Sequence, residues 1–258
     1  MGIITLTTDW HPDDYFAGAV RGRILSLCPG TQVVDLAHSI PPFQLTQAAF
    51  VLLHGYAHFP PGTVHICGLM TETRQLPLLV HHDKHFFLLP DNGLVGMLFP
   101  EGDVTVYRLE GIRQDTLFPV LDQLVPAACE LLRGKKPEKL GTPVTDMKIT
   151  HPVHAAIDEG IITGLVVHID SYSNLITNIT RALFERVGRG KPFEIFPGTG
   201  SLSYRITRLN QHYYDTPVAD IFALFNSLGL LEIGIAHGNA AELLGVQIQS
   251  PIRIRFKE

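Results

Sequence analysis

The apolar and polar positions in the first half of the chain alternate between two periods. Short β-rich runs cover residues 3–8, 32–37 and 63–69. Between them, at 16–27 and 45–56, apolar residues recur every three or four positions, the spacing of a helix with one buried face. Strands that alternate with helices are joined by right-handed crossovers, so this half predicts an α/β sandwich with a largely parallel sheet.

Two more apolar runs and a last helical pattern complete this half. The runs at 78–80 and 86–89 are joined by a polar turn, and 122–132 has helical periodicity. Residues 135–150 are rich in Lys, Pro, Gly and Thr and lack periodicity, which predicts a linker. We therefore expect an N-terminal α/β domain over residues 1–145.

After the linker the pattern changes to short β-rich runs separated by turns. These runs cover residues 160–169, 193–196, 204–209, 230–235 and 252–256. Such spacing is typical of a small antiparallel barrel or sandwich. The predicted fold class is thus α/β with a smaller, β-barrel-like C-terminal domain over residues 151–258.

Composition narrows the class of protein. Of 258 residues, 45% are hydrophobic, which excludes intrinsic disorder, and no run reaches the roughly 20 apolar residues of a membrane span. The net charge is −5 and no basic cluster exceeds Lys135-Lys136, so we expect no nucleic-acid or membrane partner. Three scattered cysteines and no secretory leader pattern argue against a disulfide framework or a zinc cage and indicate a cytoplasmic protein.

Candidate ligand-binding residues follow the strands of the first half. Ligands of parallel sheets gather at the carboxyl ends of strands, where the loops 9–11, 38–43 and 70–75 are expected. The Asp9 carboxylate has two acceptor oxygens suited to a sugar diol, and the Phe43 ring is suited to stacking on a base or sugar. The alternative is structural: Asp9 caps a turn and Phe43 packs under a helix.

The chain has 13 histidines, which raises the question of a metal site. His81, Asp83 and His85 would share one face if they stood in a single strand. Because they fall in a predicted hairpin turn, we favour a solvated surface turn and expect no metal. No zincin, serine-hydrolase, P-loop or dinucleotide-binding motif occurs with its required flanks.

A third candidate site is the polar turn within IDSYSNLITNI, residues 169–179. Asp170 and Asn174 are expected to lie close together across it. A carboxylate can hold an ammonium group, and an amide can donate to and accept from an adenine edge. The alternative is an Asx turn in which both side chains bond the backbone.

Several segments share a pattern when they are taken in order along nearly the whole chain. They are TLTTDWHPDDYFAG (5–18), VRGRILSLCPGTQVVDLAHSIPP (20–42), QAAFVLLHGYAHFPPGTVHI (47–66), PDNGL (90–94), IDSYSNLITNI (169–179), NSLGLLEI (226–233) and GNAA (238–241). The ordered set resembles the S-adenosyl-L-methionine (SAM) hydroxide adenosyltransferases, or SAM hydrolases, whose halogenating relatives are the fluorinases and chlorinases.

The resemblance implies a homotrimer in which SAM lies between the N-terminal domain of one subunit and the C-terminal domain of the next. SAM would be the substrate or ligand, with no separate cofactor. Carried over by position, the implied substrate-binding residues are Asp9 (ribose diol), Phe43 (beside the ribose), Asp14 and Met70, together with Asp170 (methionine ammonium), Asn174 (adenine edge) and Ser227 (methionine carboxylate).

The chain departs from the family at two loops. The family's Asp-Pro-Gly-Val-Gly run after the third strand is absent, and of that loop only Arg74 matches. Pro119 and Leu121 stand where the family has a catalytic His and Arg. We therefore expect Arg74 and Glu72 to be the catalytic residues, with Glu72 orienting the attacking water.

Two functions remain open from the sequence. One is a SAM hydrolase with a remodelled loop. The other is a non-catalytic relative that binds SAM, adenosine or another small ligand, or that only maintains the trimer. Formation of adenosine and methionine from SAM distinguishes them. A metal hydrolase that uses the turn from His81 to His85 is a third, less favoured alternative.

Overall fold

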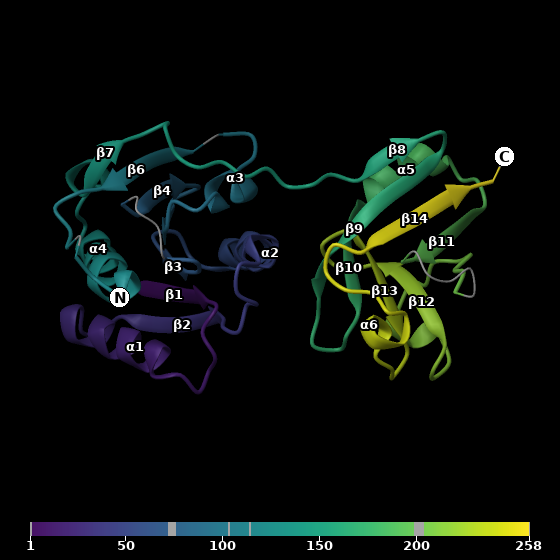
Figure 1. The fold of residues 1–258 in the computed structure, drawn as a ribbon, viewed down its shortest axis with the longest axis horizontal. Coiled ribbons are helices and arrows are strands. Elements are labelled where there is room, and N and C mark those ends of the chain that lie inside the picture. Colours follow the sequence, from purple (N-terminus) through teal and green to yellow (C-terminus); the bar gives the residue numbers. More distant parts are fainter. Residues whose placement is uncertain (1, 72–75, 103, 114, 199–203, 258) are drawn as a thin grey trace. The chain divides into compact units, whose positions relative to one another are not determined.

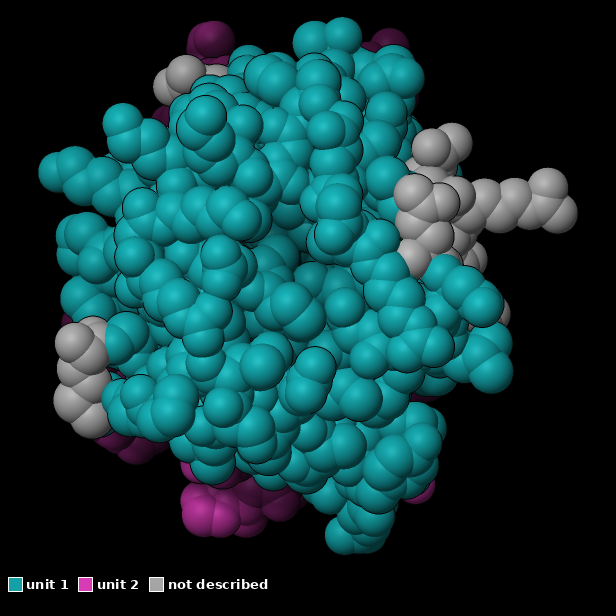
Figure 2. Space-filling view, turned by 90° about the vertical axis from the view of Figure 1, so that its left-hand side faces the viewer, with its two compact units in different colours: residues 1–152 teal, residues 153–258 magenta. Residues whose placement is uncertain are grey.

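A computed structural model describes residues 2–71, 76–102, 104–113, 115–198 and 204–257 (Figure 1). The chain forms two compact units, Met1–Pro152 and Val153–Glu258 (Figure 2). In the described part of the chain, no helix has the length and apolar character needed to cross a membrane.

The first unit contains one seven-stranded mixed sheet. Its order is β2-β1-β3-β5-β4-β6-β7, formed by β1 (Ile3–Thr8), β2 (Gln32–Ala37), β3 (Val64–Gly68), β4 (Leu78–His82), β5 (His85–Leu89), β6 (Thr105–Leu109) and β7 (Gly141–Pro143). Strands β2, β1, β3 and β5 pair in parallel, whereas β4, β6 and β7 join antiparallel. The prediction of a largely parallel sheet is wrong for that second half. The cause is the tight turn Asp83-Lys84, whose positive φ angles of 46° and 64° reverse the chain between β4 and β5.

Helices cover both faces of this sheet. They are α1 (Tyr15–Leu27), α2 (Leu45–Gly55), α3 (Leu94–Leu98) and α4 (Val125–Leu132), with a π-helical turn η2 (Val120–Leu124) leading into α4 and short 3₁₀ turns η1 (Tyr56–His58) and η3 (Pro137–Lys139). Successive residues of β4 point to opposite faces of the sheet. Leu79 packs in the core with α1 and α4, whereas Leu78 and Val80 pack in the core with α2 and α3. The unit is a three-layer α/β sandwich.

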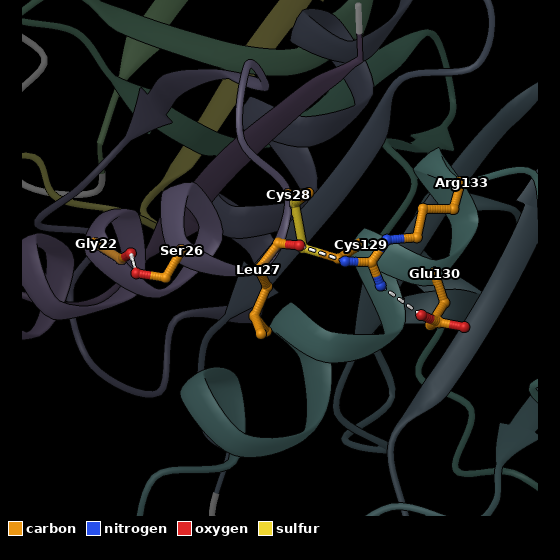
Figure 3. The surroundings of a disulfide bond; sticks show 7 residues. All are labelled: Gly22, Ser26, Leu27, Cys28, Cys129, Glu130 and Arg133. Atoms are coloured by element: carbon orange, nitrogen blue, oxygen red, sulfur yellow. Dashed lines mark hydrogen bonds and ion pairs between the residues drawn. A yellow bond between two sulfur atoms is a disulfide. The ribbon is translucent and has the colours of Figure 1, made fainter.

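A disulfide joins two helices on the same face. Cys28 follows α1 and Cys129 lies in α4, with Cα atoms 5.7 Å apart, and their sulfur atoms are bonded (Figure 3). The Arg133 guanidinium, from the end of α4, also donates to the Leu27 carbonyl. The interpretation against a disulfide framework did not anticipate this bond, because the two cysteines are 101 positions apart and only the packing of α1 on α4 brings them together. Cys67 is free and fully buried, and burial raises the pKa of its thiol to about 12.

The segment expected to be a linker is ordered on the first unit. Residues 135–150 include η3 and β7, and Val144 and Met147 pack against the core under α2 and α3. The Lys148 backbone N–H donates to Asp91 Oδ1 at 2.8 Å. These apolar and backbone contacts were hidden by the polar composition of the segment.

The second unit is an antiparallel sheet. Its main order is β11-β14-β9-β10-β13-β12 with β8 added to β9, formed by β8 (Ala156–Asp158), β9 (Ile161–Ile169), β10 (Leu175–Thr180), β11 (Phe193–Pro197), β12 (Ile221–Phe225), β13 (Leu230–Ile235) and β14 (Pro251–Phe256). The sheet curls as an open half-barrel, and within the described residues its edge strands β11 and β12 do not pair with each other. The run expected as a strand at 204–209 contributes only a bridge between Ile206 and Ile195.

Among the described residues of the second unit, the helical elements are α5 (Arg181–Gly188), η4 (Tyr213–Asp215) and α6 (Ala240–Leu243). The Thr180 hydroxyl begins α5 by accepting from the Leu183 N–H at 3.1 Å, a side-chain N-cap. The largest helical side chain in this core, Phe184, packs edge-on against Phe193, Phe225 and Phe256.

Candidate functional site

The first group of predicted residues lies at the carboxyl ends of β1 and β3. Asp9 follows β1, and its Oδ2 accepts from the Met70 N–H at 3.5 Å, so the fold brings these two predicted residues together. Burial raises the pKa of the Asp9 carboxyl, opposed by hydrogen bonds from the backbone of Met70 and of Asp9 itself. Met70 has a positive φ of 49°, which turns the chain sharply after β3. The Asp9 carboxylate is therefore half buried at the carboxyl ends of β1 and β3, beside the sharp turn at Met70.

The VDLAH segment supports the same edge from β2. His38 Nε2 lies 3.1 Å from Asp35 Oδ1, and His38 Nδ1 lies 2.7 Å from Thr8 Oγ1. Asp35 also pairs with Arg21 of α1. Burial opposes ionisation of Asp35, but hydrogen bonds from Arg21 and His38 outweigh it and lower the pKa of the carboxyl. This network anchors the end of β1 directly before Asp9.

The PDNGL segment holds the loop that carries Met70. Asn92 is buried; its Nδ2 donates to the Leu69 carbonyl at 3.0 Å, and its Oδ1 accepts from the Leu94 N–H at 3.1 Å. Asp91, also buried, accepts from Arg108 at 3.2 Å. Asn92 of this motif therefore fixes the position of the loop that carries Met70.

Two other predicted residues of this unit are exposed. Asp14 precedes α1, and its Oδ2 accepts from the His11 N–H at 3.0 Å. Phe43 exposes 76% of its surface at a positive φ of 65°, so the alternative in which it packs under a helix is wrong. Its ring is free to meet a ligand.

The second group lines a cavity of about 940 Å³ in the second unit. Its wall includes four aromatic rings and two polar side chains from the turn after β9: Tyr172, Tyr213, Tyr214, Phe222, Asp170 and Asn174. Flat rings beside a few polar groups are typical of a small-molecule site.

The turn between β9 and β10 is an Asx turn for Asp170, but the alternative in which both side chains bond the backbone is wrong for Asn174, whose amide bonds other side chains. Asp170 Oδ1 accepts from the N–H groups of Tyr172 at 2.9 Å and Asn174 at 2.8 Å. The second oxygen, Oδ2, lies 3.5 Å from Asn174 Nδ2. The carboxylate therefore shapes the turn with one oxygen and presents the other beside Asn174.

Sequence reasoning missed Glu232, which lies behind this turn. It is buried in β13 and accepts from Asn174 Nδ2 at 3.0 Å, Asn226 Nδ2 at 3.0 Å and Tyr213 Oη at 3.2 Å. Burial, and then the Glu232 charge, raise the pKa of the Tyr213 hydroxyl to about 12. The available signal was a single acid within the apolar run LLEIGI.

Ser227 lies in the turn between β12 and β13 and is exposed. The turn is held by its neighbour Asn226, whose Oδ1 accepts from the N–H groups of Leu228 at 3.0 Å and Leu230 at 3.2 Å. Because Asn226 also donates to Glu232, the turn of Ser227 and the turn of Asn174 share one buried carboxylate.

His81, Asp83 and His85 do not share one face of a single strand, because the chain turns between β4 and β5. Asp83 occupies the β4–β5 turn, and His82 pairs across to His85. His85 points inward, its Nδ1 3.1 Å from His65 Nε2. In the part of the chain that the structure describes, no group of three or more His, Cys, Asp or Glu side chains could hold a metal ion.

Two family models match the chain. The SAM hydroxide adenosyltransferase N-terminal domain matches residues 4–141, and the C-terminal domain of the same family matches residues 164–253. The chain belongs to the SAM hydroxide adenosyltransferase family. The curled half-barrel and the mixed-sheet sandwich are thus the two domains of this family.

Similar proteins include named hydrolases. A protein of Thermus thermophilus named (R)-S-adenosyl-L-methionine hydrolase is 28% identical over 96% of this chain and 97% of its own. One of the same name from Methanocaldococcus jannaschii is 27% identical over 99% and 97%. A fluorinase of Actinoplanes is 24% identical over 73% of this chain and 75% of its own.

Solved structures share the fold. An uncharacterized conserved protein from Thermotoga maritima aligns with a TM-score of 0.88 at 22% identity, covering 98% of this chain and 99% of its own. A conserved hypothetical protein from Thermus thermophilus aligns with a TM-score of 0.77 at 26% identity, covering 98% and 100%.

The loops where this member departs from its family are partly described. Glu72 and Arg74, the predicted catalytic residues, lie outside the described residues. Pro119 directly precedes the π-helical turn η2, which contains Leu121 and Asp122. Asp122 Oδ2 accepts from Thr116 Oγ1 at 2.6 Å.

An arginine that sequence reasoning missed also stands at this turn. Arg113 Nη1 lies 3.6 Å from Asp122 Oδ2. Phe118 packs 5.6 Å from Trp10, the residue after Asp9, so the segment before η2 borders the same strand edge. A guanidinium therefore reaches Asp122 from a position eight residues before Leu121.

Proposed function

We propose that this protein binds SAM and hydrolyses it to adenosine and L-methionine. The observation that carries the proposal is the aromatic cavity with Asp170 and Asn174 on its wall, in a chain whose full-length relatives are named SAM hydrolases. Aromatic rings suit a purine, and a carboxylate suits an ammonium group.

Within this proposal the two groups of residues bind different parts of SAM. Asp9 accepts from the ribose hydroxyls, Phe43 and Met70 lie beside the ribose, and Asp14 lies near the methionine end. In the second unit, Asn174 meets the adenine edge, Asp170 the methionine ammonium and Ser227 the carboxylate. We further propose a homotrimer in which each ligand binds at a subunit interface.

The reaction is an in-line displacement at the ribose carbon bonded to sulfur. A water oxygen forms a bond to that carbon, the carbon–sulfur bond breaks, and its electron pair neutralises the sulfonium as methionine leaves. The water proton is lost to a base or to solvent. Since the leaving group needs no proton, the protein has only to place and activate the water, the task proposed for Glu72 and Arg74.

A second candidate is a non-catalytic protein that binds SAM or adenosine. It is favoured by Pro119 and Leu121, since neither side chain can orient or deprotonate a water. The Arg113–Asp122 pair favours the hydrolase, because Asp122 is the residue of that loop that matches the family and Arg113 places a guanidinium beside it.

Product analysis separates the two candidates. Purified protein is incubated with SAM, and adenosine and methionine are quantified by chromatography against a protein-free control. The hydrolase proposal requires both products in equal amounts, above the control. Calorimetric binding of SAM without products supports the second candidate, and binding of neither SAM nor adenosine contradicts both.

We also propose a cytoplasmic location, where SAM hydrolysis meets its substrate in a reducing compartment. The Cys28–Cys129 bond sets a condition on this proposal, because reducing compartments keep most thiols free. Alkylation in cells lysed directly into denaturant, which exposes the buried thiols, tests the location. Labelling of all three cysteines would support a reducing compartment, whereas labelling of Cys67 alone would show that the Cys28–Cys129 bond forms in the cell and would contradict the cytoplasmic proposal.

A further inference from the structure

One buried carboxylate connects three loops around the aromatic cavity. Glu232 exposes 2% of its surface and is not part of the cavity wall. Its Oε1 accepts from Asn174 Nδ2, and its Oε2 accepts from Asn226 Nδ2 and from the Tyr213 hydroxyl. These donors come from the β9–β10 turn, the β12–β13 turn and η4 respectively.

The carboxylate determines which way the Asn174 amide faces. An ionised carboxylate only accepts hydrogen bonds, so the NH₂ end of the amide must face Glu232 at 3.0 Å. Asn174 Oδ1 then faces away, and within the described residues no donor bonds it. Since Asn174 lines the cavity, the unused group there is an acceptor.

Gly234 leaves room for this orientation. A Cβ at position 234 would lie 2.4 Å from Asn174 Oδ1 and 2.3 Å from the Phe222 ring. Both distances are shorter than a Cβ atom can approach, so only glycine fits beside the amide. Phe222 also lines the cavity, so the acceptor stands beside an aromatic face. An acceptor edge next to a ring matches a purine that carries an amino group.

We propose that Glu232 is a positioning residue that holds the Asn174 carbonyl toward the cavity and so selects a 6-amino purine over a 6-oxo purine. This rests on the proposed binding of an adenine-containing ligand. A 6-amino group donates to Asn174 Oδ1, whereas a 6-oxo group would place two acceptors against each other and leave both unpaired.

The variant Glu232→Gln tests the orientation because it replaces one acceptor oxygen with a donor. Asn226 cannot turn without losing the two backbone N–H groups of Leu228 and Leu230 that bond its Oδ1. The glutamine carbonyl is therefore expected to stay at Asn226, and its NH₂ group to face Asn174. The Asn174 amide then has to turn, opposed by the long 3.5 Å contact to Asp170, and presents NH₂ to the cavity.

The experiment measures calorimetric affinities for adenosine and inosine. The wild type is expected to prefer adenosine by about ten-fold or more, since mispairing a buried polar group costs of that order, and Glu232→Gln is expected to abolish or reverse that ratio. The matched control is Glu242→Gln, which changes an exposed acid that likewise accepts from an asparagine, Asn239, at 3.1 Å. The control should keep the wild-type ratio.

Each outcome decides something. If Glu232→Gln loses affinity for both nucleosides equally, or keeps the wild-type ratio, the positioning role is wrong while the proposed function stands. If the variant does not fold, the wild type alone decides, because equal affinity for adenosine and inosine overturns the inference. If the wild type binds neither SAM nor a free nucleoside, the proposed function itself fails.

Discussion

The carboxylates of this protein act differently according to the donors that surround them. Asp91 is buried and occupied by Arg108 and the Lys148 N–H, which makes it structural. Asp170 shares its two oxygens between a turn and Asn174. Asp9 is half buried, and the groups that bond it are backbone N–H donors. Its side chain therefore keeps capacity to accept hydrogen bonds from a ligand.

The first prediction concerns Asp9. Asp9→Asn is expected to weaken SAM binding by roughly ten- to a hundred-fold, because a hydrogen bond to a charged group contributes about 1.5–3 kcal/mol. Titration calorimetry measures the change. The control Asp13→Asn alters a neighbouring exposed acid that pairs with His11 and should bind as the wild type does. Equal affinity of all three proteins would remove Asp9 from the site.

The second prediction concerns a buried histidine pair. His65 is fully buried with Nδ1 2.8 Å from Thr5 Oγ1 and Nε2 3.1 Å from His85 Nδ1. Burial, and then the neighbouring His85, lower the pKa of His65 to about 3, and burial also lowers the pKa of His85. The folded protein thus holds these rings neutral at pH values where the unfolded chain binds protons.

Stability should therefore fall on acidification. The unfolded His65 has a pKa near 6.5, so its contribution is complete above that pH and is lost between about 6.5 and 3. From pH 7.5 to pH 5, urea unfolding is expected to show a decrease of about 2 kcal/mol from this residue. His65→Gln should flatten the dependence, whereas His151→Gln, at an exposed position, should not. The same slope in both variants would rule out the pair as its source.

At the scale of elements, the fold ties distant segments together on each face of the sheet. The helices α1 and α4 share one face, and the disulfide and Arg133 join them there (Figure 3). On the other face Asp91 and Asn92 bind the loop after β3 and the segment before the second unit. The Asn92 contact thus holds the loop of Met70 beside Asp9, whereas the disulfide joins the helices near the amino ends of β1 and β2.

The third prediction concerns the disulfide. The bond closes a loop of about 100 residues, which in the chain-entropy model stabilises the folded state by about 4–5 kcal/mol. Guanidinium unfolding of the wild type should shift to lower denaturant in dithiothreitol. The double variant Cys28→Ser, Cys129→Ser should unfold at the lower position with or without reductant. Sensitivity of the double variant to reductant would assign the effect to Cys67.

At the scale of the whole molecule, the residues proposed to bind the ligand are divided between two units. The Asp9–Met70 edge belongs to the first unit and the aromatic cavity to the second. The proposed homotrimer provides both groups at every subunit interface.

The fourth prediction follows from that division. Light scattering after size exclusion should give three times the 28.5 kDa chain mass. Mixing Asp9→Asn with Asp170→Ala subunits, after dissociation and reassembly, should restore tight SAM binding at some interfaces, because a pair of neighbours then supplies both intact groups. A monomer that binds SAM tightly would contradict the shared site.

Much of the secondary structure could be predicted from local pattern. The strands at 3–8 and 32–37 and the helix α1 follow directly from the spacing of their apolar residues. The π-helical turn before α4 and the helix α5 could not, because the first depends on packing around Val120 and the second is a short polar helix that begins at a Thr180 cap.

The candidate site likewise contains residues that local sequence predicts and residues that it does not. Asp170 and Asn174 were predictable because a short turn joins them, so their proximity is a local property. Glu232 was not, since its partners lie 58, 19 and 6 residues away and only the pairing of β10, β12 and β13 assembles them. A buried acid in an apolar strand is visible in sequence, but its donors are not.

The sequence by itself determined the family, the α/β and β-rich halves and the residues carrying candidate chemistry, because these depend on local periodicity and on motif order. Only the tertiary structure decided the mixed sheet, the Cys28–Cys129 bond, the Arg113–Asp122 pair and the Glu232 network. Each of these depends on which distant segments pack face to face. Such contacts arise when apolar faces are buried together, and no single stretch of sequence records which faces will meet.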